Sequence, residues 1–342
     1  MKNQKVSDNE NKKLTQSCIV LGSMLISIAA LAGGAAPVTP VTTIKPQLKI
    51  TPAEHFSGAT SVKMLAAARA GKRIVAVGDF GVVLLSDDEG KTFYQARSVP
   101  VSSTLTAVAF TDANSGWAVG HWGAILKTTD GGQTWLQQRS DIAVDQPLFS
   151  VYFKNAGEGW AVGLWSLMLH TTNGGANWSV VSLPPPAGAK KADRNLYSIF
   201  GDAKGGLFVT SEQGRVLHST DSGATWIYAE TGYSGSLWTG ISLNDGSLLV
   251  GGLRGTIYRS VDGGENWQAS KTNLKSSVTD IVQRADKAIV AVGLDGLVML
   301  STDGGLTFTG TQRQDRAALT AAVDTQAAGG TKLFSSQGPV SE

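Results

Sequence analysis

Six short segments of this chain contain an aspartate or asparagine at a repeated position. A serine or threonine stands two residues before it, and a glycine and then an aromatic residue follow it. They fit the pattern [ST]-x-[DN]-x-G-x-[TN]-[WF], the Asp box, and their acidic or amide residues are Asp88, Asp130, Asn173, Asp221, Asp262 and Asp303. The D-x-G form is that of a calcium loop, but the motif position of each segment supplies one carboxylate at most where calcium needs several oxygens. The side-chain oxygen can instead accept backbone N–H groups while the glycine adopts a positive φ, which closes a tight turn. We therefore predict six structural turns and no metal site.

The spacing of these turns indicates a repeated unit. Successive Asp-box positions lie 42, 43, 48, 41 and 41 residues apart. This period suits one four-stranded blade of a β-propeller per repeat. The 41 glycines and the lack of long helical patterns also favour an all-β protein.

Each repeat contains four segments with strand character. An inner strand such as Leu105 to Phe110 is followed by a second strand such as Gly116 to Gly120, which is apolar on both faces and suits a position between neighbouring blades. A third strand then enters the Asp box and a fourth leaves it. The inner strands of the later repeats are expected at Leu148 to Phe153, Leu196 to Phe200, Leu237 to Leu243 and Val278 to Val282.

Six Asp boxes still allow seven blades. After the last box, Ala318 to Val323 and Lys332 to Ser336 repeat the first two strands, and Gln47 to Thr51 stands where a fourth strand would precede the first blade. Joining these segments closes the ring and removes exposed sheet edges. We predict an all-β, seven-bladed propeller of four-stranded antiparallel blades over residues 47–342, with its seventh blade formed by N- and C-terminal strands.

The N-terminal region has the composition of an export signal. Four lysines precede an apolar run from Cys18 to Ala32, which predicts a signal peptide over residues 1–32, followed by an extended linker over residues 33–46. An uncleaved membrane anchor is the alternative, because Cys18 to Ala36 is just long enough to span a bilayer. The expected location is the periplasm, or the thylakoid lumen if the source is photosynthetic.

The charge balance excludes some partners. Of 29 basic and 27 acidic residues, four and two lie in residues 1–32, so a chain cleaved there keeps 25 of each. This balance gives no electrostatic footprint for nucleic acid. Cys18 is the sole cysteine, so a cleaved chain has no disulfide and no thiol nucleophile.

The repeated combination GWAVGxxGxILxTxDGGxTW resembles the photosystem II assembly and stability factor family. The resemblance covers about residues 47–340. It implies an exported seven-bladed propeller without an active site or cofactor, which binds newly made membrane-protein subunits or assembly complexes at the membrane periphery. Similar propellers also occur in bacteria without photosynthesis.

One departure from the family concerns its arginine-rich patch. Arg254 and Arg259 are the main arginines in the matching segments of this chain, and the positions equivalent to Arg259 in other repeats carry Leu85, Lys127, His170, His218 and Leu300. This difference favours a member outside photosynthesis.

Enzyme functions find little support in the residues. A sialidase needs an arginine cluster and an Arg-Ile-Pro segment, but the nearest match, Arg73 to Val75, lacks the proline. A glycoside hydrolase needs two carboxylates across a groove, whereas Asp79, Glu212 and Asp295 fall in different blades. The four histidines show no ligand spacing, and His170 and His218 occupy one repeated position. We expect no catalytic residues, with a glycan-binding or glycan-cleaving propeller as the alternative.

The predicted binding residues follow the second strands. Phe80, Trp122 and Trp165 occupy the same turn position in three adjacent blades, where later blades carry Gln213, Arg254 and Asp295. Grouped exposed aromatic residues are typical of a binding surface. The alternative is that each ring packs over the neighbouring blade.

An insertion from Leu183 to Asn195 lengthens the third repeat beside these aromatics. Its prolines stiffen it, and Lys190, Lys191 and Arg194 give it positive charge, as in a contact loop. Together with Arg254, these residues and the aromatics form the predicted partner-binding set. The sequence thus favours a monomeric, non-catalytic scaffold that binds a membrane-protein partner through one propeller face.

Overall fold

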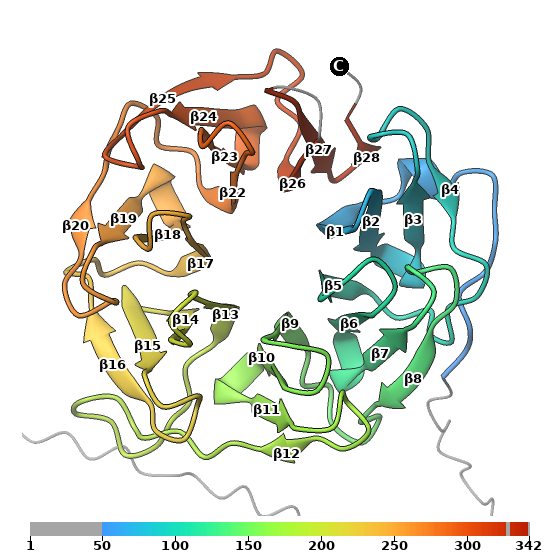
Figure 1. Ribbon diagram of the computed structural model, residues 1–342, viewed down its shortest axis with the longest axis horizontal. Coiled ribbons are helices and arrows are strands. Elements are labelled where there is room, and N and C mark those ends of the chain that lie inside the picture. Colours follow the sequence, from blue (N-terminus) through green and yellow to red (C-terminus); the bar gives the residue numbers. More distant parts are fainter. Residues whose placement is uncertain (1–49, 326–328, 341–342) are drawn as a thin grey trace, which may run out of the picture. The chain divides into compact units, whose positions relative to one another are not determined.

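The computed structural model describes residues 50–325 and 329–340, which form a ring of antiparallel sheets (Figure 1). Seven inner strands surround the centre of this ring. They are β1 (Met64–Ala70), β5 (Leu105–Phe110), β9 (Leu148–Phe153), β13 (Leu196–Gly201), β17 (Leu237–Ser242), β22 (Val278–Gln283) and β26 (Leu319–Asp324).

Each inner strand pairs with a second strand, and each second strand with a third. The second strands are β2 (Arg73–Gly78), β6 (Gly116–Gly120), β10 (Gly159–Gly163), β14 (Leu207–Ser211), β18 (Leu248–Gly252), β23 (Ile289–Gly293) and β27 (Thr331–Ser335). The third strands are β3 (Val83–Ser86), β7 (Ile125–Thr128), β11 (Met168–Thr171), β15 (Arg215–Ser219), β19 (Ile257–Ser260), β24 (Leu297–Ser301) and β28 (Gly338–Pro339).

Six blades also have an outer fourth strand. These strands are β4 (Tyr94–Gln95), β8 (Leu136–Arg139), β12 (Ser179–Val180), β16 (Ile227–Glu230), β20 (Gln268–Ala269) and β25 (Thr307–Gln312). A short strand β21 (Lys271–Thr272) leaves the fifth blade and pairs in parallel with β25 of the sixth. The seven-bladed all-β architecture predicted from the sequence is therefore confirmed.

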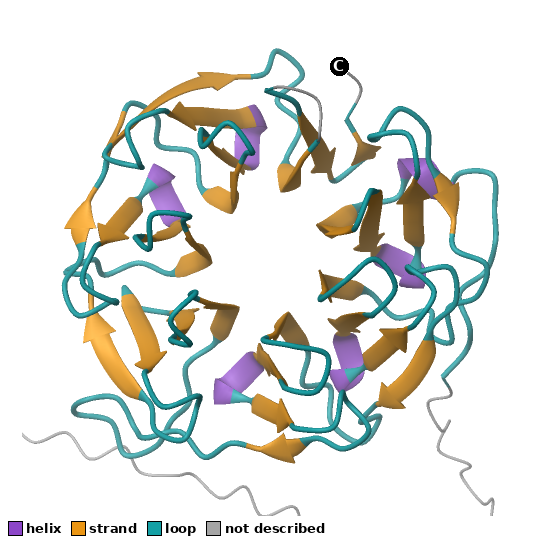
Figure 2. Ribbon diagram, in the orientation of Figure 1, coloured by secondary structure: helices purple, strands orange, loops and turns teal. Residues whose placement is uncertain are grey.

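Helical structure in the described residues is limited to single turns of 3₁₀ helix (Figure 2). One of them, η1 (Ala59–Ser61), precedes the first blade. The others join second to third strands and are η2 (Asp79–Gly81), η3 (His121–Gly123), η4 (Leu164–Ser166), η5 (Leu253–Gly255) and η6 (Leu294–Gly296).

The last blade closes the ring, but one part of the predicted closure is wrong. Strands β26, β27 and β28 form the seventh blade as expected, and β26 packs against β1. Of the expected fourth strand, Gln47–Lys49 lie outside the described residues, while Ile50 and Thr51 form no strand. They lie instead against the first two blades, where the Thr51 hydroxyl contacts that of Ser102 at 2.8 Å and Ile50 packs on the apolar cluster.

The path of the next residues explains this difference. The backbone N–H of Ala53 bonds to Val99, and the carbonyl of Glu54 accepts the amide of Gln95. These contacts provide hydrogen-bond partners for backbone groups of the segment along the outer side of blade 1, so the segment does not pair with blade 7. The seventh blade consequently has three strands in the described residues.

The inner strands are joined by threonine hydroxyls. Each inner strand shows an irregular register near its start, such as that between Leu319 and Ala321. Thr320 in this region donates to the carbonyl of Met64, and Thr106 and Thr279 make the equivalent bonds to Leu148 and Leu319 of the next blade. The Thr320 bond links blade 7 to blade 1, so it closes the ring at the hub.

The core lies between blades, where the second strands supply buried residues on both faces. All five residues of β6 and of β10 are buried. Trp117 of β6 stacks on Phe153 of the next blade at 3.5 Å between ring centroids, and its indole N–H donates to Gly174. Each blade is therefore packed against its neighbour through side chains of the second strand.

The Asp boxes form the turns between third and fourth strands. In the last box, Asp303 accepts the Ser301 hydroxyl, the Thr307 hydroxyl and the backbone N–H groups of Leu306 and Thr307. Asn173 does the same in its own box with Thr171 and the N–H of Asn177. In both boxes the Asp or Asn side chain closes the turn.

The boxes also join one blade to the next. The first glycine of a box offers its carbonyl to a side chain from the preceding blade. Arg73 donates to Gly131, Lys127 to Gly174 and Arg259 to Gly304. The repeated position that carries Lys127 and Arg259 is thus used to bind the neighbouring turn.

Replacing Asp303 with Asn tests the charge in this turn. The Thr307 hydroxyl and N–H hold the pKa of Asp303 at about 2, below the ordinary value of 3.8. Because the folded pKa is lowered, the stabilisation is present above about pH 4 and is lost as the pH falls toward 2. Asp303→Asn should reduce the free energy of unfolding in urea at pH 7, and parent and variant should converge near pH 2. A difference independent of pH would contradict this assignment.

Asp280 of β22 carries the opposite effect at the hub. Its carboxylate accepts the N–H groups of Ala322 and Ile281, and burial raises its pKa to about 6 despite these bonds. The folded chain then keeps a proton that the unfolded chain releases, so stability decreases as the pH rises from about 4 through 6.

The neutral variant Asp280→Asn should remove this loss. We expect it to be more stable than the parent by about 2 kcal/mol at pH 8, and no more stable at pH 4. Thermal unfolding at both pH values measures the difference. Equal stability of the two chains at pH 8 would show that the buried charge has no cost.

Candidate functional site

The candidate site lies on the side of the ring that carries the turns between second and third strands. We call this side the turn face; it also carries the connections from each blade to the next, as shown by the bond from His121 N–H to Thr104. The Asp boxes lie at the other side with the turns between first and second strands, as the bond from Gly131 to Asn114 shows. Alternation of strand direction within each blade requires this separation.

One backbone conformation recurs at the middle of the turns on this face. The residue there has a φ between 54° and 61°, in the left-handed region that non-glycine residues rarely adopt. These residues are Phe80, Trp122, Trp165, Gln213, Arg254 and Asp295. The backbone conformation of the turn is thus the same in six blades, while the side chain at its middle residue differs.

The three aromatic side chains differ in exposure. Phe80 is 64% exposed and Trp165 is 58% exposed, so neither ring is covered by a neighbouring blade. Trp122 is half-buried. It borders a shallow depression with Phe80, Ser102 and His121, so the aromatics of blades 1 and 2 share one surface feature.

The Trp122 turn is held by the segment that follows it. The Trp122 N–H donates to the Asp145 carboxylate at 3.3 Å, and the Trp122 carbonyl accepts the N–H of Asp141 at 2.7 Å. The next residue, Gly123, accepts a bond from the Arg139 guanidinium. The loop between β8 and β9 therefore fixes this indole in place.

The Trp165 turn is tied to the end of the insertion. The Trp165 N–H donates to the Asn195 side chain at 3.1 Å, and the Ser166 N–H donates to the Arg194 carbonyl at 2.7 Å. Asn195 in turn donates to Glu212 of the next blade at 2.9 Å. The last residues of the predicted contact loop, Arg194 and Asn195, therefore contact the Trp165 turn.

The three basic residues of the insertion differ in exposure. Lys190 and Lys191 are exposed, whereas Arg194 is half-buried. The Nε of Arg194 is buried and makes no hydrogen bond within the described residues. Two lysines of the insertion are therefore exposed to solvent.

The two arginines compared with the family patch have separate roles. Arg259 is committed to structure, since its guanidinium donates to Gly304 at 2.8 Å and lies 3.6 Å from Asp245. Arg254 is exposed in the middle of η5 on the turn face. Of the two, Arg254 alone is exposed.

A pocket next to Trp122 was missed by the sequence analysis. It has a volume of about 180 Å³ and lies between η3, the loop after β8 and the segment at Ile50. The available signal was the presence of Ile142 and Val144 in an otherwise polar loop, where both are exposed.

The carboxylates considered for hydrolysis are each held by their own partners. Asp79 accepts the Thr104 hydroxyl, Glu212 accepts the Asn195 amide, and Asp295 lies 2.7 Å from Arg316. They belong to blades 1, 4 and 6. The structure does not bring them together as an acid pair.

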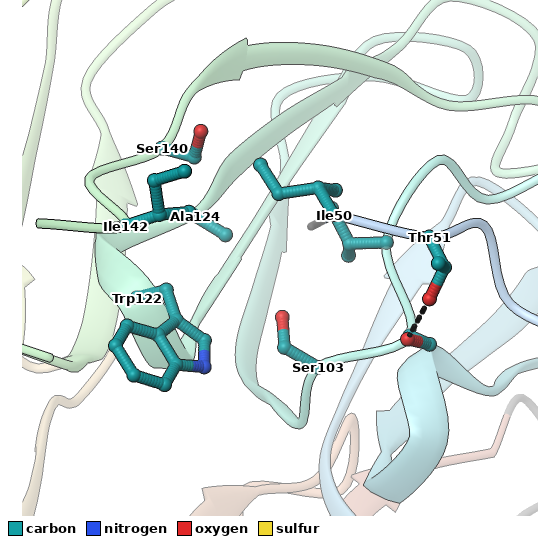
Figure 3. Close-up of a pocket in the computed structure, with 9 residues that line it drawn as sticks. Ile50, Thr51, Ser103, Trp122, Ala124, Ser140 and Ile142 are labelled. Atoms are coloured by element: carbon teal, nitrogen blue, oxygen red, sulfur yellow. Dashed lines mark hydrogen bonds between the residues drawn. The ribbon is translucent and has the colours of Figure 1, made fainter. Parts of the chain in front are cut away.

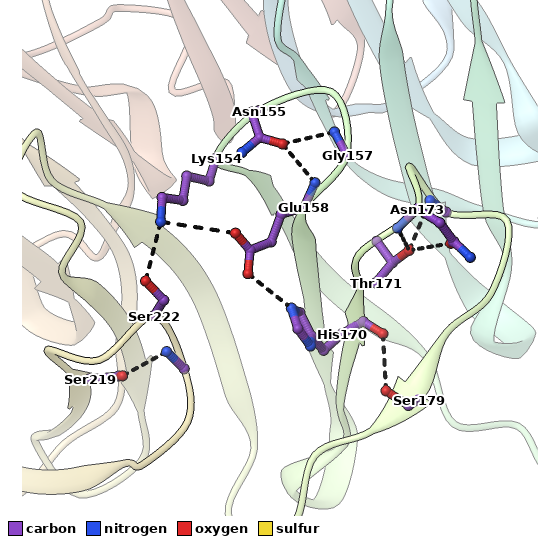
Figure 4. A network of polar contacts seen from close by, with 12 residues as sticks. Lys154, Asn155, Gly157, Glu158, His170, Thr171, Asn173, Ser179, Ser219 and Ser222 are labelled. Atoms are coloured by element: carbon purple, nitrogen blue, oxygen red, sulfur yellow. Dashed lines mark hydrogen bonds and ion pairs between the residues drawn. The ribbon is translucent and has the colours of Figure 1, made fainter.

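A polar network joins blades 3 and 4 (Figure 4). Lys154 lies 3.9 Å from Glu158 and 3.2 Å from the Ser222 hydroxyl, and His170 Nε2 lies 3.4 Å from Glu158. His170 also stacks on Trp160. These contacts join the turn after β9, strand β11 and the Asp-box turn of blade 4. We assign the network to packing between blades.

Two further findings concern the described residues as a whole. Within residues 50–325 and 329–340, no three or more His, Cys, Asp or Glu side chains gather as a metal site would require. In the same ranges, no helix combines the length and the apolar character that crossing a bilayer demands.

Comparison with known proteins agrees with the repeat pattern. Residues 94–227 match the family model described as Photosynthesis system II assembly factor YCF48. The predicted family resemblance is confirmed. No curated protein matches the chain significantly.

Solved structures share the fold at low identity. A structure described as "YCF48 bound to D1 peptide" is 20% identical, with a TM-score of 0.65, and the match covers 86% of this chain and all of that one. YCF48 from Cyanidioschyzon merolae is 17% identical, with a TM-score of 0.63, and the match covers 82% of this chain and 94% of that one. An ancestral GH74 enzyme is 14% identical at a TM-score of 0.63, and the match covers 83% of this chain but 45% of the enzyme.

Replacing Phe80 with Gly tests whether the exposed ring serves the fold. Glycine adopts a positive φ without strain, so Phe80→Gly should leave the free energy of unfolding unchanged or raise it by up to about 1 kcal/mol. Trp122→Gly is the matched control, because it has the same backbone but a half-buried ring and should destabilise the chain. Chemical denaturation measures both. A clear loss of stability in Phe80→Gly would assign its ring to packing.

Proposed function

We propose that this chain is a non-catalytic assembly or scaffold factor that binds a segment of a membrane-protein partner through its turn face. The observation that carries the proposal is the pair of rings of Phe80 and Trp165, which stand exposed on rigid turns with Trp122 between them. Exposed aromatics on a fixed frame are the side chains that dominate protein interfaces, because they bury a large area at little entropic cost.

The comparisons support the class of function. The matched family model describes an assembly factor, and a similar solved structure is described as a complex with a D1 peptide. In the present chain, Lys190 and Lys191 are exposed in the insertion whose end contacts the Trp165 turn, and Arg254 is exposed on blade 5. The binding residues proposed are therefore Phe80, Trp122, Trp165, Lys190, Lys191, Arg194 and Arg254.

The proposed setting is the far side of an inner membrane, in the periplasm or the thylakoid lumen. The basic lead and apolar run before Ala32 support export, and the balanced charge of the remaining chain supports a protein partner more than nucleic acid. The chain would act as a monomeric propeller at the membrane periphery.

A glycan-directed function is the second candidate, since the ancestral GH74 enzyme shares the fold. Stacked aromatics would hold sugar rings in such a protein. The separate commitments of Asp79, Glu212 and Asp295 favour glycan binding over cleavage within this alternative.

The triple variant Phe80→Ala, Trp122→Ala and Trp165→Ala tests the leading proposal. We expect it to lose at least about tenfold in affinity for membrane proteins that the parent enriches from solubilised envelope, because each ring contributes buried apolar area. Quantitative mass spectrometry of the captured fraction measures the loss.

A matched control removes three exposed apolar residues elsewhere. Leu136, Val180 and Ile227 lie on the outer strands of blades 2, 3 and 4, away from the turn face. Their replacement by Ala should leave capture intact. Equal capture by parent and aromatic variant would remove the proposal, and specific retention of the parent on a glycan array would favour the alternative.

A further inference from the structure

We propose that the pocket beside Trp122 is the anchor site for the partner, and that it takes one aliphatic or aromatic side chain of an extended polypeptide segment whose adjacent Lys or Arg pairs with Asp145. This inference rests on the proposed function and makes it more specific. It commits to one feature of the partner, namely an apolar residue next to a cation.

The walls of the pocket are apolar and come from separate parts of the chain (Figure 3). Trp122 and Ala124 belong to the turn after β6, Val101 to the connection before β5, and Ile142 to the loop after β8. Ile50 closes the opposite side. These walls are preformed, because Val101 and Ala124 are buried and the Trp122 backbone is fixed by Asp141 and Asp145.

The volume matches one side chain. The pocket encloses about 180 Å³. An apolar cavity of about 150 Å³ is enough to bind benzene. The pocket is therefore large enough for a leucine, isoleucine or phenylalanine side chain.

The rim of the pocket is suited to a polypeptide backbone. Hydroxyl groups of Thr51, Ser102, Ser103 and Ser140 surround the apolar walls. The Thr51 and Ser102 hydroxyls contact each other at 2.8 Å, which leaves further donor and acceptor capacity on both. Such groups can bond to N–H and carbonyl groups of an extended segment lying across the opening.

Charge complementarity selects the residue next to the anchor. Asp145 accepts the Trp122 N–H, and its exposed carboxylate lies 3.9 Å from His121 Nδ1. The neighbouring Asp141 lies 3.7 Å from Arg139, so it already has a cationic partner. Because Trp122 lines the pocket, the Asp145 carboxylate bonded to its N–H places a negative charge beside that wall, which favours a Lys or Arg in the segment.

The pocket continues into the depression under Phe80. Ser102, Ser103 and Trp122 line both hollows. A segment anchored in the pocket would pass over Trp122 and contact the Phe80 ring. The two aromatics of blades 1 and 2 thereby act on one ligand.

Ala124→Leu tests the pocket without changing the aromatic rings. Leucine fills the space, and the repeat itself tolerates it, since Leu167 and Leu297 stand at the equivalent position after η4 and η6. Thr256→Leu, at the same position after η5 and far from this pocket, is the matched control. Asp145→Asn tests the charge while keeping an oxygen for the Trp122 N–H.

The probe is a phage-displayed library of random dodecapeptides selected on the full chain. The parent and Thr256→Leu should enrich peptides that carry an aliphatic or aromatic residue close to Lys or Arg. For a synthetic peptide of that class, Ala124→Leu should weaken binding measured by fluorescence anisotropy by at least about tenfold. Asp145→Asn should weaken it by about two- to fivefold and reduce its dependence on salt.

The outcomes separate this inference from the proposed function. Unchanged binding in Ala124→Leu, together with loss in the triple aromatic variant, would overturn the pocket and leave the function standing. A parent that enriches no peptide class would overturn both. Self-association of the parent that Ala124→Leu abolishes would assign the pocket to a second copy of the chain and overturn the inference.

Discussion

The structure depends on how backbone groups are satisfied in the turns between third and fourth strands. One carboxyl or amide side chain in each box accepts the hydroxyl and N–H groups around it, so the turn needs no contact with solvent or partner. The first glycine carbonyl of a box is then free to accept Arg73, Lys127 or Arg259 from the preceding blade. The same turn therefore ends one blade and fastens it to the next.

This arrangement divides the two sides of the ring by function. At the side of the boxes, side chains are used to hold blades together. On the turn face, Trp122 and Trp165 make their bonds through their backbone N–H groups, whereas Asp295 also pairs through its side chain with Arg316. The side chain is free to change from Phe to Gln, Arg or Asp between blades. The backbone of this turn is constant between blades while its exposed residue varies.

The sequence predicts the fold well because the physical signals are local and repeated. The Asp boxes, the apolar second strands and their spacing identify the blades without knowledge of distant contacts. The N-terminal closing strand was predicted wrongly, since the path of this segment depends on contacts of Thr51 with Ser102 and of Ala53 with Val99 that no local pattern reveals. The position of Phe80, Trp122 and Trp165 in equivalent turns followed from the repeat.

Features formed by several segments that are distant in sequence could not be predicted from the sequence. The pocket beside Trp122 needs Ile50, Val101 and Ile142 to meet, and these residues belong to three different connections. The commitment of Arg259 to Gly304 likewise depends on the packing of blade 5 against blade 6. Aromatic residues in a turn can be counted from the sequence, whereas their exposure depends on the loop that packs beside each one.

The central claim is that the turn face, and not the opposite side of the ring or its outer strands, receives the partner. Hydrogen–deuterium exchange of the chain with and without a captured membrane-protein segment tests this most directly. The account predicts slower exchange on binding in residues 79–81, 121–123, 140–146 and 164–166, with the six Asp-box turns unchanged. Protection confined to the Asp-box turns or the outer strands would contradict it.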